Sequence, residues 1–169
     1  MQKEREKFMK ILIIGIVASG KTTLAKQLSN KNKIDYYEID SIVHNDMENK
    51  RRTDEEQKEI IKEINKQENW IIEGTLRKNL YYLLDMADKV IYLDIPLHIR
   101  KRRIIFRYIK QKLKIESCNY DPNISMLKKM YKWTNEFENT RLDFEKELLM
   151  HNEKIIKLKN TKQIKKFEL

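Results

Sequence analysis

The chain has 169 residues, of which 40% are hydrophobic and 37% are charged, and its formal net charge is +10 at pH 7. This composition is that of a globular protein with a heavily charged surface, which excludes an intrinsically disordered chain. The longest apolar run, residues 11–18, is far shorter than the roughly 18 residues that a transmembrane helix needs. The lone cysteine, Cys118, cannot form an internal disulfide or build a zinc site by itself. We therefore expect one domain in a cytoplasmic protein that is neither exported nor membrane-spanning.

The positive charge is concentrated in residues 100–114, which carry eight cations and no acid, whereas the rest of the chain has a net charge of only +2. Such a cluster suits a phosphate-rich ligand, either a nucleotide or a nucleic acid backbone. The alternative is a solvated helix face in a lysine-rich protein, which is the ordinary reason for a run of charge.

Two strands are predicted near the beginning of the chain. Residues 10–14 form an apolar run that ends at Gly15, and residues 24–28 continue with a helical pattern, so we expect a strand, a turn and a helix in that order. Residues 1–8 precede them as a charged, loose extension. Residues 34–39 read as the second strand.

A polar segment and a capped helix come next. Residues 40–52 are expected to form a polar loop or an irregular helix. Thr53 and Glu56 have the spacing of a capping box, which predicts a helix running to about residue 66. Residues 70–72 then form a third short strand, followed by Glu73 and Gly74.

Two further strands flank a long helical stretch. The fourth strand covers residues 90–93 and ends at Asp94, with Pro96 opening the next helix. Helical patterns extend from residue 97 to about 114 and from 124 to 150, with a break at 116–123 where Asp121, Pro122 and Asn123 indicate a turn. Residues 154–158 form the fifth strand. Strands that alternate with helices call for an α/β fold with a parallel sheet and helices on both faces.

Residues 15–22 match the phosphate-loop pattern G-x-x-x-x-G-K-[ST], after a predicted strand and before a predicted helix. The glycines let the backbone wrap around phosphate oxygens, the lysine reaches the terminal phosphates, and the threonine hydroxyl meets magnesium. Only three glycines occur in the chain, and two of them lie here. The predicted nucleotide-binding residues are Gly15, Ala18, Ser19, Gly20, Lys21, Thr22 and Thr23.

Acidic residues end three of the predicted strands, and ligands of open parallel sheets bind beyond these ends. Glu73 is expected to order magnesium together with Thr22, either directly or through water. Asp40 is expected to orient or deprotonate an acceptor hydroxyl, and capping of the following turn is an equal alternative. For Asp94 we favour a helix-capping role over a magnesium role, because Pro96 and a helix follow at once.

Arginine is the cation best suited to the migrating phosphoryl group, because it binds phosphate bidentately and stays charged. Arg103 and Arg107 lie four residues apart, so one helix can present both to phosphates. The full set of arginine candidates is Arg77, Arg100, Arg103, Arg107 and Arg141.

The order of these motifs resembles the P-loop proteins of the nucleoside-monophosphate-kinase type, and most closely the bacterial branch labelled DNA topology modulation protein or FlaR-like kinase. The resemblance spans residues 10–158. Residues 73–77, Glu-Gly-Thr-Leu-Arg, correspond in acid, glycine and arginine to the Asp-Gly-Phe-Pro-Arg segment of adenylate-kinase-like enzymes. The chain lacks their Thr-Gly-Asp segment after the second strand and their four-cysteine lid, so it departs from a true adenylate kinase and the resemblance does not identify its acceptor.

This resemblance implies a three-layer P-loop NTPase fold with a five-stranded parallel sheet and a helical lid at about residues 97–150. Arg103 and Arg107 resemble the lid arginines of the family. The topology-modulation label implies a connection to DNA but does not show direct binding.

The leading hypothesis is a kinase that transfers the terminal phosphate of Mg-ATP, or Mg-GTP, to a small acceptor such as a nucleotide or nucleoside. Its catalytic residues would be Lys21, Asp40, Arg77, Arg103 and Arg107, with Thr22 and Glu73 at Mg²⁺. The alternative is an ATP-dependent regulator that binds nucleic acid through residues 100–114. A third hypothesis is nucleotide binding without turnover.

Overall fold

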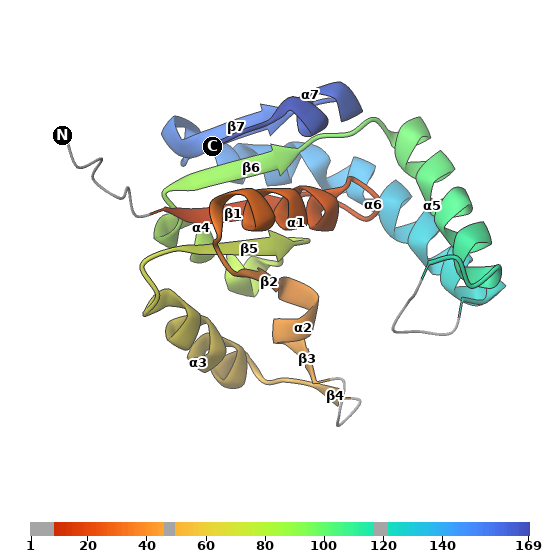
Figure 1. Ribbon diagram of the computed structural model, residues 1–169. Coiled ribbons are helices and arrows are strands. Elements are labelled where there is room, and N and C mark those ends of the chain that lie inside the picture. The colour runs from red at the N-terminus through yellow and green to blue at the C-terminus, as the bar shows by residue number, and fades with distance from the viewer. Residues whose placement is uncertain (1–8, 46–49, 117–121) are drawn as a thin grey trace.

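The computed structural model describes residues 9–45, 50–116 and 122–169. Its centre is a sheet of five parallel strands in the order β2-β5-β1-β6-β7 (Figure 1). The strands are β1 (Lys10–Ile14), β2 (Tyr36–Glu38), β5 (Trp70–Gly74), β6 (Lys89–Leu93) and β7 (Ile155–Leu158). The prediction of a five-stranded parallel sheet is therefore confirmed, with strand ends that differ from the expected ones by one or two residues.

Helices cover both faces of this sheet. Successive side chains of each strand point to opposite faces, and each face has its own apolar core. Leu12 and Ile14 of β1 pack into one apolar core, and Ile11 and Ile13 into the other. The first core is covered by α2 (Ile39–Val43), α3 (Asp54–Asn65), α4 (Leu83–Met86) and the end of α6 (Ile124–Leu149). The second core is covered by α1 (Lys21–Asn32) and α7 (Thr161–Lys166). The protein is thus a three-layer α/β structure.

The helix after the predicted capping box is confirmed as α3. The hydroxyl of Thr53 accepts a hydrogen bond from the Glu56 amide, and the Glu56 carboxylate accepts one from the Thr53 amide. These two hydrogen bonds give partners to two backbone amides that a free helix N-terminus leaves unpaired. Short 3₁₀ turns, η1 (Lys78–Leu80) and η2 (Asn152–Lys154), join other elements.

The segment after β2 is more regular than the sequence predicts. Residue Ile39 was expected to end a strand, but it begins α2, and a small antiparallel pair of β3 (His44–Asn45) and β4 (Lys50–Arg51) follows. Of the two expectations for residues 40–52, a polar loop or an irregular helix, the helix is what begins this segment, and its buried residues Ile39, Ile42 and Val43 form an apolar face. Residues 46–49 of that expected loop, the expected extension at 1–8, Cys118 and Asp121 lie outside the described residues.

The helix α5 (Leu97–Lys112) lies beyond the carboxyl ends of the strands, and α6 returns from it toward the sheet (Figure 1). This pair corresponds to the predicted lid region. Arg100 and Ile104 of α5 are buried, whereas Ile105, Phe106 and Ile109 are exposed. Across the described residues, no helix has the length and apolar character needed to cross a membrane.

Candidate active site

The phosphate loop connects β1 to α1 and has a backbone shape that its sequence dictates. Ala18 and Gly20 both have positive φ, at 62° and 103°, and the second value strongly favours glycine. A Cβ at Gly15 would lie 2.7 Å from Ser19 Oγ and 3.0 Å from the carbonyl oxygen of Leu93. The Ser19 amide donates to the carbonyl of Ile16, 3.2 Å away, and closes the loop. The spacing of the motif is therefore that of a tight loop at the end of the central strand.

The N-terminus of α1 is left open, unlike that of α3. Gly20 stands at its N-cap with no side-chain hydrogen bond, and its first turn contains no acidic residue. The first turn of α3, by contrast, has a complete capping box and three acidic residues. Since the amides at a helix N-terminus attract anions, α1 keeps this end available for phosphate. Thr23, a predicted nucleotide contact, is exposed in this first turn.

Lys21, Thr22 and Glu73 meet at the beginning of α1. Lys21 Nζ donates to the carbonyl of Ile16 at 3.2 Å, and Thr22 Oγ1 donates to Glu73 Oε1 at 2.5 Å. Burial lowers the pKa of Lys21, although the charge of Glu73 opposes the shift. Burial likewise raises the pKa of Glu73, opposed by Lys21 and by the hydrogen bond from Thr22. Both groups thus have their charged forms disfavoured by lost solvation.

The predicted pair of magnesium ligands, Thr22 and Glu73, is brought together by α1 and β5. A hydroxyl and a carboxylate are hard oxygen ligands of the kind that Mg²⁺ prefers. In the part of the chain that the structure describes, no group of three or more histidine, cysteine, aspartate or glutamate side chains could hold a metal ion. Nucleotide phosphates and water would therefore complete the coordination, which is how Mg²⁺ is ordinarily bound beside phosphate.

Ser19 supplies a polar atom without a partner inside the loop. Its side chain is fully buried, and its Oγ makes no hydrogen bond to the described residues. A buried polar group is normally paired, so an unpaired one at this place calls for an explanation. A phosphate oxygen in the loop would provide the missing partner.

Asp40 and Arg77, both predicted to handle the acceptor, form an ion pair, with Arg77 Nη2 3.3 Å from Asp40 Oδ1. The charge of Asp40 acts on Lys21 and Glu73, so the four groups share one edge of the sheet. Glu38 is the N-cap residue of α2, and no side chain caps that helix. The capping alternative for Asp40 is therefore not what the structure shows.

This neighbourhood depends on a close approach between β5 and α2. A Cβ at Gly74 would lie 2.5 Å from the Cβ of Ile39, so only glycine fits there without movement. Ile39 begins α2 directly before Asp40. The third glycine of the chain thus brings the acidic ends of β2 and β5 together.

Arg103 is held against the phosphate loop. Its Nη1 donates to the carbonyls of Ala18, at 3.0 Å, and Ser19, at 2.8 Å, and its Nη2 donates to Thr161 Oγ1 at 2.8 Å. Burial lowers the pKa of this guanidinium. Arg103 therefore connects α5, the loop and the beginning of α7.

Arg107 lies one turn further along α5 and forms an ion pair with Glu116, with 3.5 Å between Nε and Oε1. Its charge contributes to the lowered pKa of Lys21, after burial. The structure thus places both predicted lid arginines on the side of α5 that faces the loop region, Arg103 in direct contact and Arg107 through its charge.

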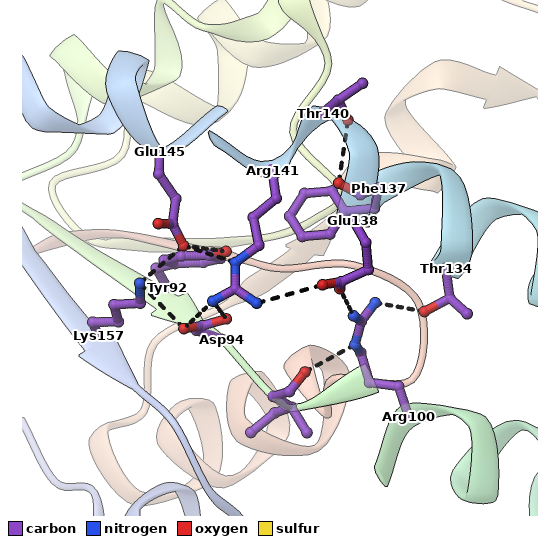
Figure 2. Close-up of polar contacts among 11 residues, drawn as sticks. Tyr92, Asp94, Arg100, Thr134, Phe137, Glu138, Thr140, Arg141, Glu145 and Lys157 are labelled. Carbon is purple, nitrogen blue, oxygen red and sulfur yellow. Dashed lines mark hydrogen bonds and ion pairs between the residues drawn. The ribbon is translucent and has the colours of Figure 1, made fainter. Parts of the chain in front are cut away.

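A second group of charged side chains lies between β6, β7, α5 and α6, and sequence reasoning did not predict it (Figure 2). Its members are Arg100, Glu138, Arg141, Asp94, Glu145 and Lys157. The spacing of Glu138, Arg141 and Glu145 on one face of α6 was the available signal.

Asp94 belongs to this group and does not cap α5. Arg141 Nη2 lies 2.6 Å from Asp94 Oδ1, and Lys157 Nζ lies 3.1 Å from Asp94 Oδ2. The N-cap of α5 is Pro96, without a side-chain hydrogen bond. The predicted capping role was therefore wrong, because two cations from α6 and β7 reach this carboxylate across the fold.

Arg100 and Arg141 are occupied by the same group, so neither is directed at the phosphate loop. The guanidinium of Arg100, only 1% exposed, donates to the carbonyl of Ile95 at 2.8 Å and also to Thr134 and Glu138. These contacts fasten α5 and α6 to the sheet.

A cavity of about 490 Å³ adjoins the first residues of the loop and was not predicted either. It lies between the segment after β5 and the second half of α6. Its lining includes Ile16, Thr75, Tyr81, Phe137 and Phe144. The sequence offers no local signal that Phe137 borders a cavity.

Comparison with known proteins relates this chain to kinases. The family model described as AAA domain matches residues 11–117. The shikimate kinase of Clostridium botulinum (strain Okra / Type B1) is 30% identical over 138 residues, which cover 72% of this chain and 78% of that protein. The cytidylate kinase of Sulfolobus acidocaldarius is 32% identical over 117 residues, or 59% of this chain and 62% of that protein, less than two thirds of its length.

Solved structures of shikimate kinases have a similar fold. The enzyme from Acinetobacter baumannii in complex with shikimate superimposes with a TM-score of 0.55 at 13% identity, covering 92% of this chain and 84% of that one. The enzyme from Aquifex aeolicus gives a TM-score of 0.50 at 19% identity, with coverage of 93% and 89%. At such identities the likeness concerns the fold alone.

Proposed function

The chain belongs to the AAA domain family, and from this premise we propose that it is an ATP-dependent kinase of the P-loop type that phosphorylates a hydroxyl group of a small molecule. The observation that carries the proposal is the meeting of Lys21, Thr22 and Glu73 at the open N-terminus of α1. A loop that serves only as a connection needs neither a half-buried lysine nor a buried carboxylate beside it.

Each side chain of the site has a distinct part in this proposal. Lys21 would exchange its hydrogen bond to the Ile16 carbonyl for one to the terminal phosphate, whose charge it would neutralise. The backbone amides of the loop would donate further hydrogen bonds to the phosphates. Thr22 and Glu73 would hold Mg²⁺, which supplies charge neutralisation between the outer phosphates when it is bound. Arg103 and Arg107 would stabilise the charge on the transferred group.

The acceptor side of the reaction falls to Asp40 and Arg77. The acceptor oxygen would form a bond to the terminal phosphorus while the bond from that phosphorus to the bridging oxygen breaks, and ADP would leave with the electron pair. The carboxylate of Asp40 would accept the hydroxyl proton. Arg77 keeps that carboxylate oriented through their ion pair.

The nucleic-acid regulator is less well supported, because its basic surface is smaller than the sequence implied. Of the cations in residues 100–114, Arg100 is buried in ion pairs and Arg103 is bonded to the phosphate loop. The exposed cations of this segment are Arg102, Arg107, Lys110, Lys112 and Lys114. Membership of the topology-modulation branch rests on the sequence motifs alone and stays a prediction.

The proposal is tested by incubating the protein with γ-labelled ATP or GTP, Mg²⁺ and a panel of nucleosides, nucleotides and hydroxylated metabolites. We expect a labelled product that Lys21→Ala abolishes. Lys26→Ala is the matched control, since Lys26 is an exposed residue of the same helix. Nucleotide hydrolysis that occurs only when duplex DNA is added would instead support the regulator.

A further inference from the structure

An open groove of about 640 Å³ lies between α5 and α6. Its apolar lining is Ile105 from α5 and Leu127 and Tyr131 from α6. Lys128, Lys132 and Glu136 are its charged lining residues. The lining residues of α6 recur every four positions, so they form one face of that helix over about 18 Å. The groove is therefore long enough to hold a segment of another chain.

The groove and the phosphate loop lie on opposite sides of α5. Arg103 donates hydrogen bonds to the loop carbonyls of Ala18 and Ser19. Ile105 follows Arg103 by two residues, which rotates it by about 200° around the helix axis. A molecule in the groove would therefore leave the nucleotide site open.

An exposed apolar stripe on α5 continues from the groove. Ile105, Ile109 and Leu113 recur every four residues, so they share one side of the helix, and they are 42%, 45% and 64% exposed. Phe106, beside Ile105, is 57% exposed. Contact of apolar side chains with water costs free energy, and a contiguous group of them ordinarily marks an interaction surface. The described residues of this chain leave the stripe uncovered.

Positive charge predominates around the groove. Residues 97–136 contain eleven lysines and arginines but only three acids. Glu116 forms an ion pair with Arg107 at 3.5 Å, and Glu136 forms one with Lys132 at 3.7 Å. The excess of positive charge favours a partner that carries negative charge.

Many of these cations are available to such a partner. Six are exposed and form no ion pair with a described residue, namely Arg102, Lys110, Lys112, Lys114, Lys128 and Lys129. Lys128 also lines the groove itself. Carboxylates beside an apolar face would therefore meet these cations while the face fills the groove.

The apolar lining decides among the classes of anionic partner. A nucleic acid backbone presents phosphates and sugars, which give Ile105 and Leu127 no apolar counterpart. A lipid surface is flat and would leave a concave groove unfilled. A second copy of the α5–α6 pair would bring like charges together. An amphipathic helix with acidic flanks supplies both the apolar face and the negative charge.

We propose that the groove between α5 and α6 is a docking site for an acidic amphipathic helix of another protein. The apolar side of that helix would cover Ile105, Leu127 and Tyr131, and its carboxylates would pair with the exposed cations nearby, Lys128 among them. The docking site does not depend on the kinase function, because its partner approaches the side of α5 that faces away from the phosphate loop.

Two designed peptides test the docking site. Each would have about 14 residues, or about four helical turns, with leucines at helical spacings of three and four and either glutamate or lysine elsewhere. We would titrate the full-length protein into each fluorescently labelled peptide and follow anisotropy, with chemical shifts of labelled isoleucine methyl groups as a second readout. The glutamate peptide should bind about tenfold or more tightly than the lysine peptide, shift the methyl signal of Ile105, and weaken as salt is raised.

Variants of the groove complete the test. Ile105→Asp should weaken the glutamate peptide about tenfold, because it places a carboxylate in the apolar lining. Lys128→Glu should weaken it about two- to five-fold, the effect of an exposed charge pair. The matched controls are Leu142→Asp and Lys58→Glu, at exposed residues outside the groove, and both should bind like the unmodified protein.

No binding of the glutamate peptide, equal binding of both peptides, or binding that ignores Ile105→Asp would overturn the docking site. Binding of duplex DNA or of phosphatidylserine vesicles that Ile105→Asp abolishes would overturn it in favour of those partners. A dimer of the free protein that Ile105→Asp dissociates in sedimentation would overturn it in favour of a second copy. The labelled product that depends on Lys21 reports the kinase function separately.

Discussion

The molecule contains two regions of partly buried charge, and the pKa values of their groups shift in opposite senses. Beside the phosphate loop, burial lowers the pKa of Lys21 and raises that of Glu73, so each group is shifted toward its neutral form. Between α6 and β7, burial opposes ionisation too, but partners prevail: the pKa of Arg141 is raised by Asp94 and Glu145, and that of Glu145 is lowered by Lys157 and Arg141.

The difference lies in the number of partners within hydrogen-bonding distance. Arg141 is 2.6 Å from Asp94 and 3.1 Å from Glu145, and Lys157 contacts the same two carboxylates. Among the described residues, the Lys21 ammonium donates only to a backbone carbonyl, that of Ile16 at 3.2 Å. Charged side chains with several partners of opposite charge serve the fold. Charged side chains with few protein partners can instead bind a charged ligand. Substitutions in the two regions should therefore separate activity from stability.

The largest effect is expected for Lys21→Met, which removes the cation meant for the terminal phosphate. Phosphoryl transfer should fall about 10²- to 10³-fold, as for the loss of one preorganised charge donor. Stability in urea should stay within roughly 1 kcal/mol, because the lost ammonium was poorly solvated and weakly paired. A large drop in stability with transfer retained would show that Lys21 belongs to the framework.

Arg100→Met should have the reverse outcome. The change removes the donor to the Ile95 carbonyl and leaves Glu138 with Arg141 alone, so the free energy of unfolding should fall by about 3 kcal/mol. The Michaelis constant for ATP should change little at temperatures where the variant is folded. Arg102→Met is the control, because Arg102 is exposed on the same helix. Equal stability of the two variants would contradict a structural role for the buried group.

Glu73→Gln should raise the Mg²⁺ concentration needed for half-maximal transfer about tenfold, since a charged metal ligand or metal-orienting group is lost. Titrating Mg²⁺ at saturating ATP measures this shift. Glu68→Gln, at an exposed residue ahead of β5, should behave like the unmodified protein. An unchanged Mg²⁺ requirement would exclude Glu73 from the metal site.

The smallest effect is a pH dependence that Glu73 should impose. Its pKa lies above the ordinary 4.5, so as pH falls it takes up a proton earlier than a solvated glutamate would. Only the ionised form attracts Mg²⁺, and the apparent affinity for Mg²⁺ should therefore decline as pH is lowered from neutral toward that raised value. Glu73→Gln should remove this decline. A wild-type affinity that stays constant to below 4.5 would contradict the assignment.

Local patterns predicted much of this architecture. The five strands follow from short apolar runs, the capping box marks α3, and the phosphate loop follows from its motif. The paired charges were not predictable, because Asp94, Arg141 and Lys157 are far apart in the sequence and only the fold brings them together. For Asp94, the local pattern of an acid shortly before a proline predicted helix capping, but the side chain forms ion pairs with Arg141 and Lys157 instead. The cavity was missed for the same reason, since its walls come from three separate segments.

Glycine usage has a consequence for mutational tolerance. A Cβ at Gly15 would meet Ser19 Oγ at 2.7 Å, Gly20 has a φ of 103°, and a Cβ at Gly74 would meet Ile39 at 2.5 Å. A close neighbour requires glycine at positions 15 and 74, and a positive φ favours it at position 20. The chain has no other glycine. In a library of random single substitutions, every glycine of this protein should be intolerant, including Gly74, which lies outside the phosphate-loop motif.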